Sequence, residues 1–277
     1  MTMLAKILVD NIAGDGKICG EWGLSIYVEF EGRRYLLDTG GSKRFSRNAA
    51  AMGVDLTKVD AGILSHAHYD HSNGMATFFA LNKTAPFYLR QEASENCYHT
   101  HKIGPFAYHK YIGIHKGWLK RFADRIVFVE DVQEIAPNVY LVPHKTPGLE
   151  SVGKTASLYV KENGKYRYDD FRHEQSLVFD TPDGLFIMNS CCHAGADNIV
   201  KEIEAVFPDK RICALLGGFH LYRTSDERVI DFANRLRDLD VQKIYTGHCT
   251  GNRAYEILRG ILGERVCQMF TGMMVKL

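Results

Sequence analysis

The pattern of apolar and polar residues near the start of the chain predicts a β-hairpin. Apolar residues alternate with polar or small ones over residues 24–30, which is the period of a strand with one buried face. Glu31 and Gly32 then supply a turn, and a second apolar run, residues 34–37, ends at Asp38. We therefore expect two paired strands with an acidic residue where the second strand ends.

The patterns after this hairpin alternate between helical and extended periods. In the first half, residues 42–52 and 75–81 predict helices, and residues 59–64 predict a strand. In the second half, Asn-Gly and Asp-Gly turns separate paired apolar runs, which predicts two more hairpins. The second-half elements are hairpins over residues 157–168 and 176–188, helices near 200–207, 229–239 and 254–262, and strands at 212–216, 243–245 and 266–270. Both halves place hairpins before helices, and no linker divides residues 1–277, so we expect one α/β domain.

Residues 95–122 show neither the period of a strand nor that of a helix. Aromatic and histidine residues are interleaved with glycines, which predicts a loop-rich insertion in the domain. Two interpretations stay open. The segment either packs as an ordinary irregular excursion or forms a lid whose rings stack on a planar substrate, with Tyr108, His109 and Trp118 as substrate-binding candidates.

Charge and composition narrow the classes of partner and location. The 34 Lys and Arg residues nearly balance the 33 Asp and Glu residues, so we expect a small-molecule substrate and no nucleic-acid partner. No apolar run of about 18 residues and no signal-peptide pattern occurs, so we expect a cytoplasmic protein that neither crosses nor binds a membrane. The seven cysteines are odd in number and lack CxxC spacing, which favours reduced thiols. A local basic cluster is either a solvated face or a contact for substrate phosphate: Lys102, Lys110, Lys116, Lys120 and Arg121.

The strongest chemical signal follows the strand predicted at residues 59–64. Within six positions the chain has three histidines and an aspartate: His66, His68, Asp70 and His71. Neutral imidazoles and a carboxylate at the rim of a sheet suit Zn²⁺, Fe or Mn²⁺. Because the adjacent Asp70 and His71 point differently from the two preceding histidines, we expect two metal ions here.

Three separated histidines in the second half lie in a similar local context. His193, His220 and His248 each follow a predicted strand and stand beside small residues that let a metal approach. Two metals with open positions need roughly five to seven protein ligands, so these residues are candidates for completing the site. His220 is also a catalytic candidate that contacts the substrate or donates a proton to it.

These motifs resemble those of the metallo-β-lactamase-fold superfamily. The shared motifs are, in chain order, Asp38-Thr39-Gly40, the His-x-His-x-Asp-His run from His66 to His71, and Gly247-His248. A narrower set is similar to the branch of 7,8-dihydropterin-6-methyl-4-(β-D-ribofuranosyl)aminobenzene 5′-phosphate synthase-like proteins: Glu174 to Leu177, Cys192 to Gly195, Gly217 to Leu221 and Thr246 to Gly251. The resemblance covers nearly the whole chain.

The resemblance implies a four-layer αββα sandwich with a binuclear site along one edge. The implied ligands are His66 and His68 for one metal and Asp70, His71 and His248 for the other, with Asp38 orienting the cluster from behind. Beyond these, we expect His193 as a ligand in preference to His173, because His193 ends an apolar strand. The bridging aspartate common in the superfamily is replaced here by Cys191-Cys192-His193, so a cysteine ligand stays an alternative.

The resemblance also implies an enzyme that uses two divalent metal ions, with Zn expected first and Fe or Mn as alternatives. For hydrolysis, Asp70 would hold and partly deprotonate a water molecule. For transfer, an arylamine would attack a pterin methylene carbon as pyrophosphate leaves. Either reaction predicts a phosphorylated or pterin-like substrate. The alternative function is non-catalytic, a metal-binding sensor or partner module on the same fold.

Overall fold

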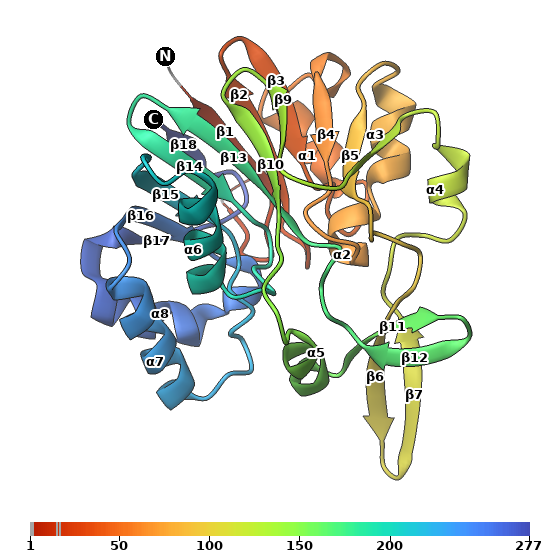
Figure 1. Ribbon diagram of the computed structural model, residues 1–277. Coiled ribbons are helices and arrows are strands. Elements are labelled where there is room, and N and C mark those ends of the chain that lie inside the picture. Colours follow the sequence, from red (N-terminus) through yellow and green to blue (C-terminus); the bar gives the residue numbers. More distant parts are fainter. Residues whose placement is uncertain (1–2, 15, 17) are drawn as a thin grey trace.

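Two large β-sheets pack face to face in the centre of the protein, and helices cover the outer face of each sheet (Figure 1). The computed structural model describes residues 3–14, 16 and 18–277. This arrangement is the four-layer αββα sandwich that the sequence predicts.

The first large sheet has the strand order β18-β1-β2-β3-β4-β5-β8. Its strands are β1 (Leu4–Val9), β2 (Ser25–Phe30), β3 (Arg33–Leu37), β4 (Ala61–Ile63), β5 (Phe87–Arg90), β8 (Ile126–Val129) and β18 (Met274–Lys276). The β2–β3 hairpin confirms the first predicted pair of strands. Helices α1 (Arg44–Ala51) and α3 (Met75–Leu81) bury phenylalanines against the outer face of this sheet. Because β3, β4, β5 and β8 are parallel, their carboxyl ends lie at one edge.

The second large sheet has the strand order β17-β16-β15-β14-β13-β10-β9. Its strands are β9 (Gln133–Ala136), β10 (Val139–Pro143), β13 (Gln175–Thr181), β14 (Gly184–Met188), β15 (Ile212–Leu216), β16 (Val241–Thr246) and β17 (Val266–Gln268). Helices α6 (Ala196–Val206), α7 (Asp226–Arg237) and α8 (Asn252–Leu262) pack on its outer face. Strands β14 to β17 are parallel, so this sheet also ends in a row of carboxyl-terminal loops.

The core between the two sheets is built from alternate residues of their strands. Val28 and Leu37 of the first sheet belong to the same buried cluster as Leu177 of the second. Phe179 projects across the interface, with its ring 5.2 Å from that of Phe30. Since successive side chains of a strand point to opposite faces, each sheet fills this core with one face and contacts helices with the other.

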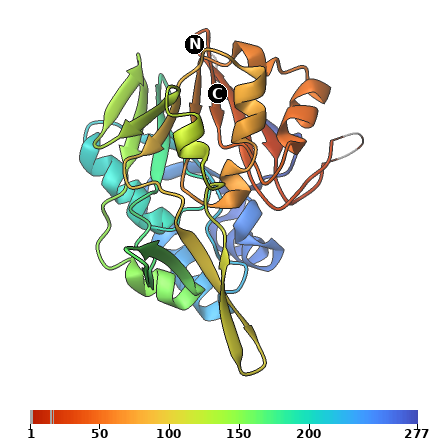
Figure 2. The ribbon, with the colours of Figure 1, turned by 90° about the vertical axis from the view of Figure 1, so that its right-hand side faces the viewer.

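The segment 95–122, which the sequence predicts to be a loop-rich insertion, contains two strands of a third sheet. This side sheet has the order β12-β11-β6-β7, with β6 (Cys97–Ile103), β7 (Phe106–Tyr111), β11 (Leu158–Glu162) and β12 (Lys165–Tyr168). The β6–β7 hairpin extends away from the body of the protein (Figure 2). Most of β7 is exposed, so its sequence lacks the apolar–polar alternation that marks a half-buried strand.

The remaining helices are short. They are α2 (Tyr69–Ser72), α4 (Trp118–Arg121), α5 (Glu150–Ala156) and the 3₁₀ helices Leu56–Lys58, His248–Thr250 and Gly263–Arg265. Helix α2 begins within the histidine cluster, directly after His68. In the described part of the chain, no helix combines the length and the apolar character needed to cross a membrane.

Candidate metal centre

The predicted site residues lie beyond the carboxyl ends of parallel strands, where loops of the two large sheets meet. The residues 66–71 follow β4, His193 follows β14, His220 follows β15, and His248 follows β16. Ligands of α/β proteins bind at such strand ends. The side chains around one cavity of about 1200 Å³ include His68, Asp70, His193, His220 and His248.

The six predicted metal ligands form two groups at this edge. The groups are His66, His68 and His193, and Asp70, His71 and His248; within each group, one ligand atom per residue lies within 4.8 Å of the others. At such separations a single ion can contact all three atoms of a group. The structure thus brings together residues as far apart in the chain as His66 and His248, which are separated by 182 positions (248 − 66).

Four ring nitrogens in these groups are buried and have no hydrogen-bond partner among the described residues. They are the Nε2 atoms of His66, His68, His193 and His248. Leaving a buried polar atom unpaired costs roughly 1–3 kcal/mol, so four such atoms in one place indicate a missing partner. With the carboxylate of Asp70 they form a donor set suited to Zn²⁺, Fe or Mn²⁺. The residues present therefore fit divalent metal ions.

Asp38 holds the centre from behind, where its side chain is fully buried. Its Oδ2 accepts hydrogen bonds from Nδ1 of His71 at 2.7 Å and from the Ser65 hydroxyl at 2.6 Å. The first bond keeps the ring proton on Nδ1 and leaves Nε2 of His71 available to a metal. Asp38 thus occupies the orienting position that the resemblance implies.

Two further residues contact predicted metal ligands, and the sequence did not indicate this role for either. Asn11 Oδ1 lies 2.8 Å from Nδ1 of His248, and the Asn11 amide donates to the His248 carbonyl at 3.1 Å. The carboxylate of Glu174 accepts the backbone N–H groups of His193 at 2.7 Å and Ala194 at 2.9 Å. Glu174 belongs to one of the motifs that carry the family resemblance, so the sequence did contain a signal that could have identified it. No sequence pattern links Asn11 with a residue 237 positions away.

Cys191 lies between the two ligand groups. Its Sγ is 3.3 Å from Nε2 of His71 and 3.5 Å from Sγ of Cys249. It also shares a ligand-sized cluster with His66 and His71 and another with His248 and Cys249. A thiolate at this position could bind either ion. The cysteine alternative therefore concerns Cys191, at the place where the sequence lacks the expected bridging acid.

Backbone strain is concentrated around the centre. The non-glycine residues there with positive φ are Asp38 (59°), Cys192 (40°), His220 (52°) and His248 (46°). Such conformations cost energy and persist where the surrounding structure enforces them, commonly at functional sites. Close packing of the loops adds to this constraint, because a Cβ on Gly217 would lie only 1.7 Å from the carbonyl oxygen of Asn189.

The protonation states of the centre favour metal binding. Burial is the main cause that lowers the pKa of His248 to about 3 and that of His220 to about 4. Burial likewise holds the pKa values of His66 and His193 well below the ordinary value. Burial alone would raise the pKa of Asp70, but the neighbouring imidazoles outweigh it and lower that pKa. Neutral rings and an ionised carboxylate are the forms that bind a metal ion. His71 departs from this pattern, because burial alone would lower its pKa but Asp70 and Asp38 outweigh burial and raise that pKa.

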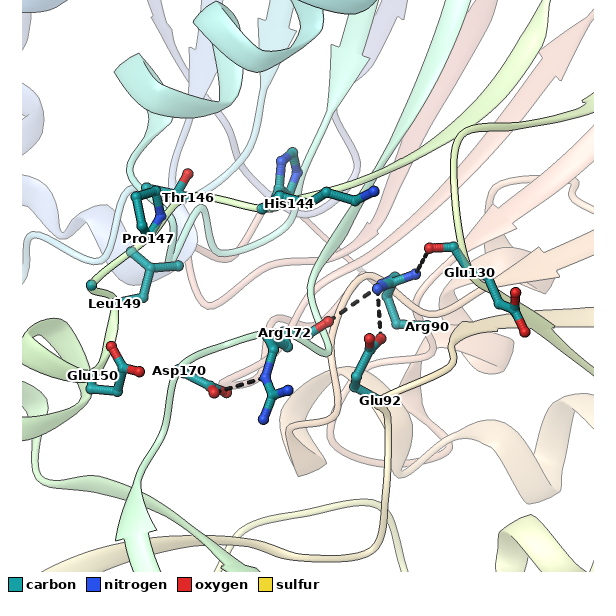
Figure 3. A pocket seen from close by; sticks show the side chains of 12 residues that line it. Arg90, Glu92, Glu130, His144, Thr146, Pro147, Leu149, Glu150, Asp170 and Arg172 are labelled. Carbon is teal, nitrogen blue, oxygen red and sulfur yellow. Dashed lines mark hydrogen bonds and ion pairs between the residues drawn. The ribbon is translucent and has the colours of Figure 1, made fainter.

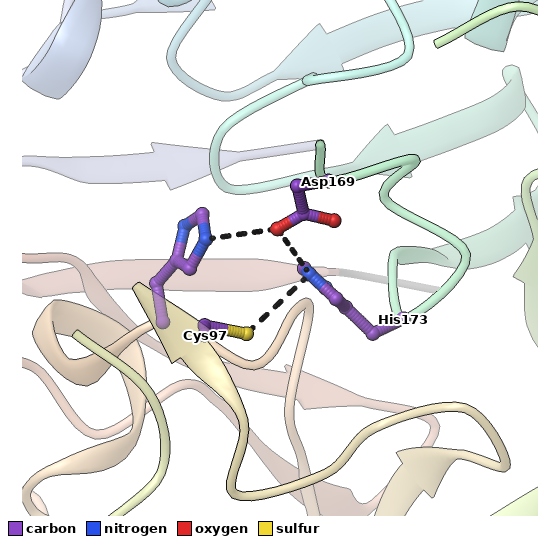
Figure 4. A group of neighbouring side chains, drawn as sticks. Cys97, Asp169 and His173 are labelled. Atoms are coloured by element: carbon purple, nitrogen blue, oxygen red, sulfur yellow. Dashed lines mark hydrogen bonds and ion pairs between the residues drawn. The ribbon is translucent and has the colours of Figure 1, made fainter. Parts of the chain in front are cut away.

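A second cluster of ligand-type side chains adjoins the centre, but its hydrogen bonds indicate a supporting network. Ligand atoms of His68, Cys97, Asp169 and His173 lie within 4.8 Å of one another (Figure 4). Nδ1 of His173 accepts a hydrogen bond from the backbone N–H of Ala67 at 3.2 Å, which puts the proton of the neutral ring on Nε2. This proton faces Oδ2 of Asp169 at 3.2 Å, so His173 Nε2 has no lone pair for a metal.

The same carboxylate lies beside a predicted metal ligand. Oδ2 of Asp169 is 3.7 Å from Nε2 of His68, and Asp169 is fully buried. Burial alone would raise the pKa of Asp169, but His173 and His68 outweigh it and hold that pKa well below its usual value. An ionised Asp169 therefore lies at ion-pair distance from His68, beyond hydrogen-bond range, and contacts the His173 ring directly.

Aromatic rings form part of the cavity wall next to the centre. The Trp22 ring lies 5.5 Å from that of Tyr222 and 5.4 Å from that of His248. The His220 ring lies 4.6 Å from that of His193, and its backbone N–H contacts Sγ of Cys249 at 3.3 Å. His220 therefore borders both the predicted ligands and the cavity. Trp22 was not singled out from the sequence, since it stands outside every motif.

The three residues predicted to stack on a substrate do not line this cavity in the described structure. His109 stacks on Tyr166 with ring centroids 3.9 Å apart, and Trp118 stacks on His115 at 4.8 Å. Tyr108 stacks on His101, whose own side chain does line the cavity. Other residues of the side sheet line the cavity: His99, Thr100, His101, Lys110 and Leu158.

A smaller cavity of about 410 Å³ lies elsewhere and contains Arg90 (Figure 3). The Arg90 guanidinium donates to the carbonyls of Val129, Glu130 and Arg172 and pairs with Glu92 at 2.6 Å. Other polar side chains that line it also have partners: His144, Lys145, Thr146, Asp170 and Arg172. Because of these contacts, few polar groups in this cavity lack a partner that a ligand could supply.

Comparisons with known proteins agree with this geometry. The Metallo-beta-lactamase superfamily profile matches residues 23–149. The chain is 27% identical over 285 aligned positions to the 7,8-dihydropterin-6-methyl-4-(β-D-ribofuranosyl)-aminobenzene-5′-phosphate synthase of Methanocaldococcus jannaschii, with 97% of this chain and 95% of that protein covered.

Solved structures share the fold over nearly the whole chain. A protein described as a metal-dependent hydrolase of the β-lactamase superfamily matches with a TM-score of 0.84 and 30% identity, covering 99% of both chains. Zinc-bound PqqB from Methylobacterium extorquens matches at 13% identity with a TM-score of 0.58, over 99% of this chain and 100% of that one, which shows a shared fold. The whole-chain match at 30% identity, together with the two ligand groups at the sheet edge, shows that the chain belongs to the metallo-β-lactamase superfamily.

Proposed function

We propose that this protein is a metal-dependent enzyme with a binuclear site that joins an arylamine to a dihydropterin-like group and releases diphosphate. The observation that carries the proposal is the set of unpaired Nε2 atoms of His66, His193 and His248, which meet the Asp70 carboxylate beside a large cavity. The name of the 27% identical synthase supports the substrate class.

In this proposal the two ligand groups each bind one ion, with Zn expected first. Ions held by these two groups would supply Lewis-acid stabilisation for the negative charge of a departing diphosphate. Asp38 and Asn11 keep the His71 and His248 rings in the orientation that presents Nε2. Asp70 completes the second ligand group with its carboxylate.

The chain's own groups around the cavity bind the reactants and move the proton. Trp22 and Tyr222 offer ring faces on which a planar pterin can stack. As the amine nitrogen forms its bond to the methylene carbon, the carbon–oxygen bond to diphosphate breaks and its electron pair leaves with the diphosphate. The amine proton passes to His220, which lies on the cavity beside His193.

Hydrolysis is the second candidate. It is favoured by the 30% identical structure described as a metal-dependent hydrolase. Water then replaces the amine, and Asp70 holds and partly deprotonates it. The cavity favours transfer, because about 1200 Å³ exceeds the ~300–1,000 Å³ of ordinary small-molecule pockets and leaves room for two reactants.

The decisive experiment supplies the metal-loaded protein with a dihydropterin diphosphate, with and without an arylamine ribose phosphate, and identifies the products by mass spectrometry. A coupled product supports transfer, whereas a free hydroxymethyl pterin in both reactions supports hydrolysis. His68→Ala should abolish either product while circular dichroism shows a folded chain. If these substrates, phosphodiesters, lactones and thioesters all give no turnover at full metal occupancy, the non-catalytic alternative, a metal-binding sensor or partner module, is correct.

A further inference from the structure

The β6–β7 hairpin presents three basic side chains to the cavity beside the metal centre. His99 and His101 are two positions apart on β6, so they share one face of the side sheet, and their ring centroids are 4.5 Å apart. Strand register places Lys110 of β7 directly opposite His99. All three side chains line the cavity. This face therefore gathers basic groups within one small area.

An arginine reaches the same region from the second large sheet. Arg223 lies between β15 and α7 and lines the cavity. After burial, the positive charges that most lower the pKa of His99 are those of His101 and Arg223, followed by His68 and Lys110. Arg223 thus lines the same cavity as His99 and Lys110, which are paired across the hairpin.

The acidic side chains that line the cavity do not neutralise the positive charge of these basic residues. The two acids that line the cavity are committed elsewhere in the described structure: Asp197 pairs with Arg235 at 2.7 Å, and Asp70 faces the His71 and His248 rings. Nδ1 of His99 is buried and has no hydrogen-bond partner among the described residues. A buried polar atom without a partner is costly, and such atoms are expected where a ligand completes them.

We propose that His99, Lys110 and Arg223 form an anion subsite that binds a phosphate ester group of the substrate next to the metal centre. A phosphate dianion offers acceptors for the ring N–H of His99 and the ammonium of Lys110, and it can accept two parallel hydrogen bonds from the guanidinium of Arg223. That the phosphate belongs to a substrate rests on the proposed function; that the three residues bind a phosphate does not. The subsite makes the side sheet the element that selects phosphorylated over unphosphorylated reactants.

The test is calorimetric titration of the metal-loaded protein with inorganic phosphate. Lys110→Met and Arg223→Gln remove one charge each from the subsite. Lys165→Met is the matched control, because Lys165 is an exposed lysine of the same sheet that does not line the cavity in the described structure. We expect the first two variants to bind phosphate roughly tenfold more weakly, as for loss of a charge-assisted hydrogen bond, and the control to bind like the wild type.

Removal of the metals separates this inference from the proposed function. If the subsite exists, chelator-treated protein still binds phosphate, and Lys110→Met still weakens the binding, whether or not the enzyme has the proposed activity. Equal phosphate affinities of wild type, Lys110→Met and Arg223→Gln would overturn the subsite, as would phosphate binding that disappears with the metals. The metal content and turnover of the variants would remain as evidence on the proposed function alone.

Discussion

Two cavities of this protein differ in whether their polar groups already have partners. Around Arg90, the guanidinium bonds to three backbone carbonyls and a carboxylate, so the cavity is held together by its own lining. In the larger cavity region, ring nitrogens of His66, His193 and His248 are buried without partners. A buried polar group without a partner is expensive, and folds keep such groups where a ligand completes them. From this comparison we expect the larger cavity to bind metal ions and substrate, and the smaller one to contribute to the stability of the fold.

The largest expected effect is a loss of turnover when a predicted metal ligand beside the larger cavity is removed. His248→Ala removes one ligand of the second group, and with it one bound ion whose stabilisation of the reaction is worth several kcal/mol, so turnover should fall about a thousandfold. Metal analysis should show one ion fewer per chain. His115→Ala, at an exposed histidine stacked on Trp118, is the control and should keep both ions. Full activity in the absence of the second ion would contradict the binuclear proposal.

For the smaller cavity we expect a loss of stability without a loss of metal or activity. Arg90→Met leaves three carbonyls and Glu92 without their partner, so the free energy of unfolding should fall by about 3 kcal/mol, measured by urea denaturation. Metal content and kcat should stay unchanged. Arg172→Met is the matched control: its guanidinium is more than half exposed and pairs with Asp170, so the loss should stay below about 1 kcal/mol. A loss of metal in Arg90→Met would mean that the two cavities are coupled.

A smaller effect tests the network at the border of the metal centre. Asp169→Asn keeps the shape of the side chain but removes the charge that faces His173 and His68. Loss of such a carboxylate typically lowers metal affinity ten- to a hundredfold. Competition with a chromophoric chelator should show this for the ion of the His66 group and leave the other ion unchanged. Cys97→Ser, which alters only the thiol beside His173, is the control.

Equal weakening of both ions by Asp169→Asn would indicate a general structural defect and contradict the positioning role. The complementary variant is Asn11→Ala, since Asn11 holds His248 of the other group. It should weaken the other ion only. The two variants together therefore report which ligand each supporting residue positions.

Many strands and helices and the ligand motif could be predicted because their signals are local, whereas the four-layer arrangement was implied by the family resemblance. Residues 24–37 carry a strand period and a turn, and the cluster from His66 to His71 occupies six adjacent positions at a strand end. The β11–β12 half of the side sheet was predicted as the hairpin over residues 157–168. The β6–β7 half could not be predicted, since β7 is exposed on most of its length and therefore has no apolar–polar alternation. Its aromatic and histidine residues pair across strands, which a single-segment pattern does not reveal.

The supporting residues of the site were missed for a different reason. Asn11 meets His248 across 237 positions, and His173 meets Ala67 across 106. Such contacts depend on the finished packing of loops from both sheets and leave no spacing in the sequence. Asp38 was found because it forms part of a recognisable motif at the end of a strand.

The smallest effects are expected for the aromatic residues that the sequence predicted to bind substrate but that do not line the cavity. Trp118→Phe and Tyr108→Ala should change kcat/KM by less than about twofold, because substitutions away from a site have little effect. Trp22→Ala should raise KM roughly fivefold, since this ring lines the cavity and stacking is worth about 1 kcal/mol. The chain has only two tryptophans, so Trp118→Phe also leaves Trp22 as a single fluorescent reporter of substrate binding. If Trp118→Phe raised KM as much as Trp22→Ala, the segment after β7 would have to close over the bound substrate, and the lid interpretation of residues 95–122 would be restored.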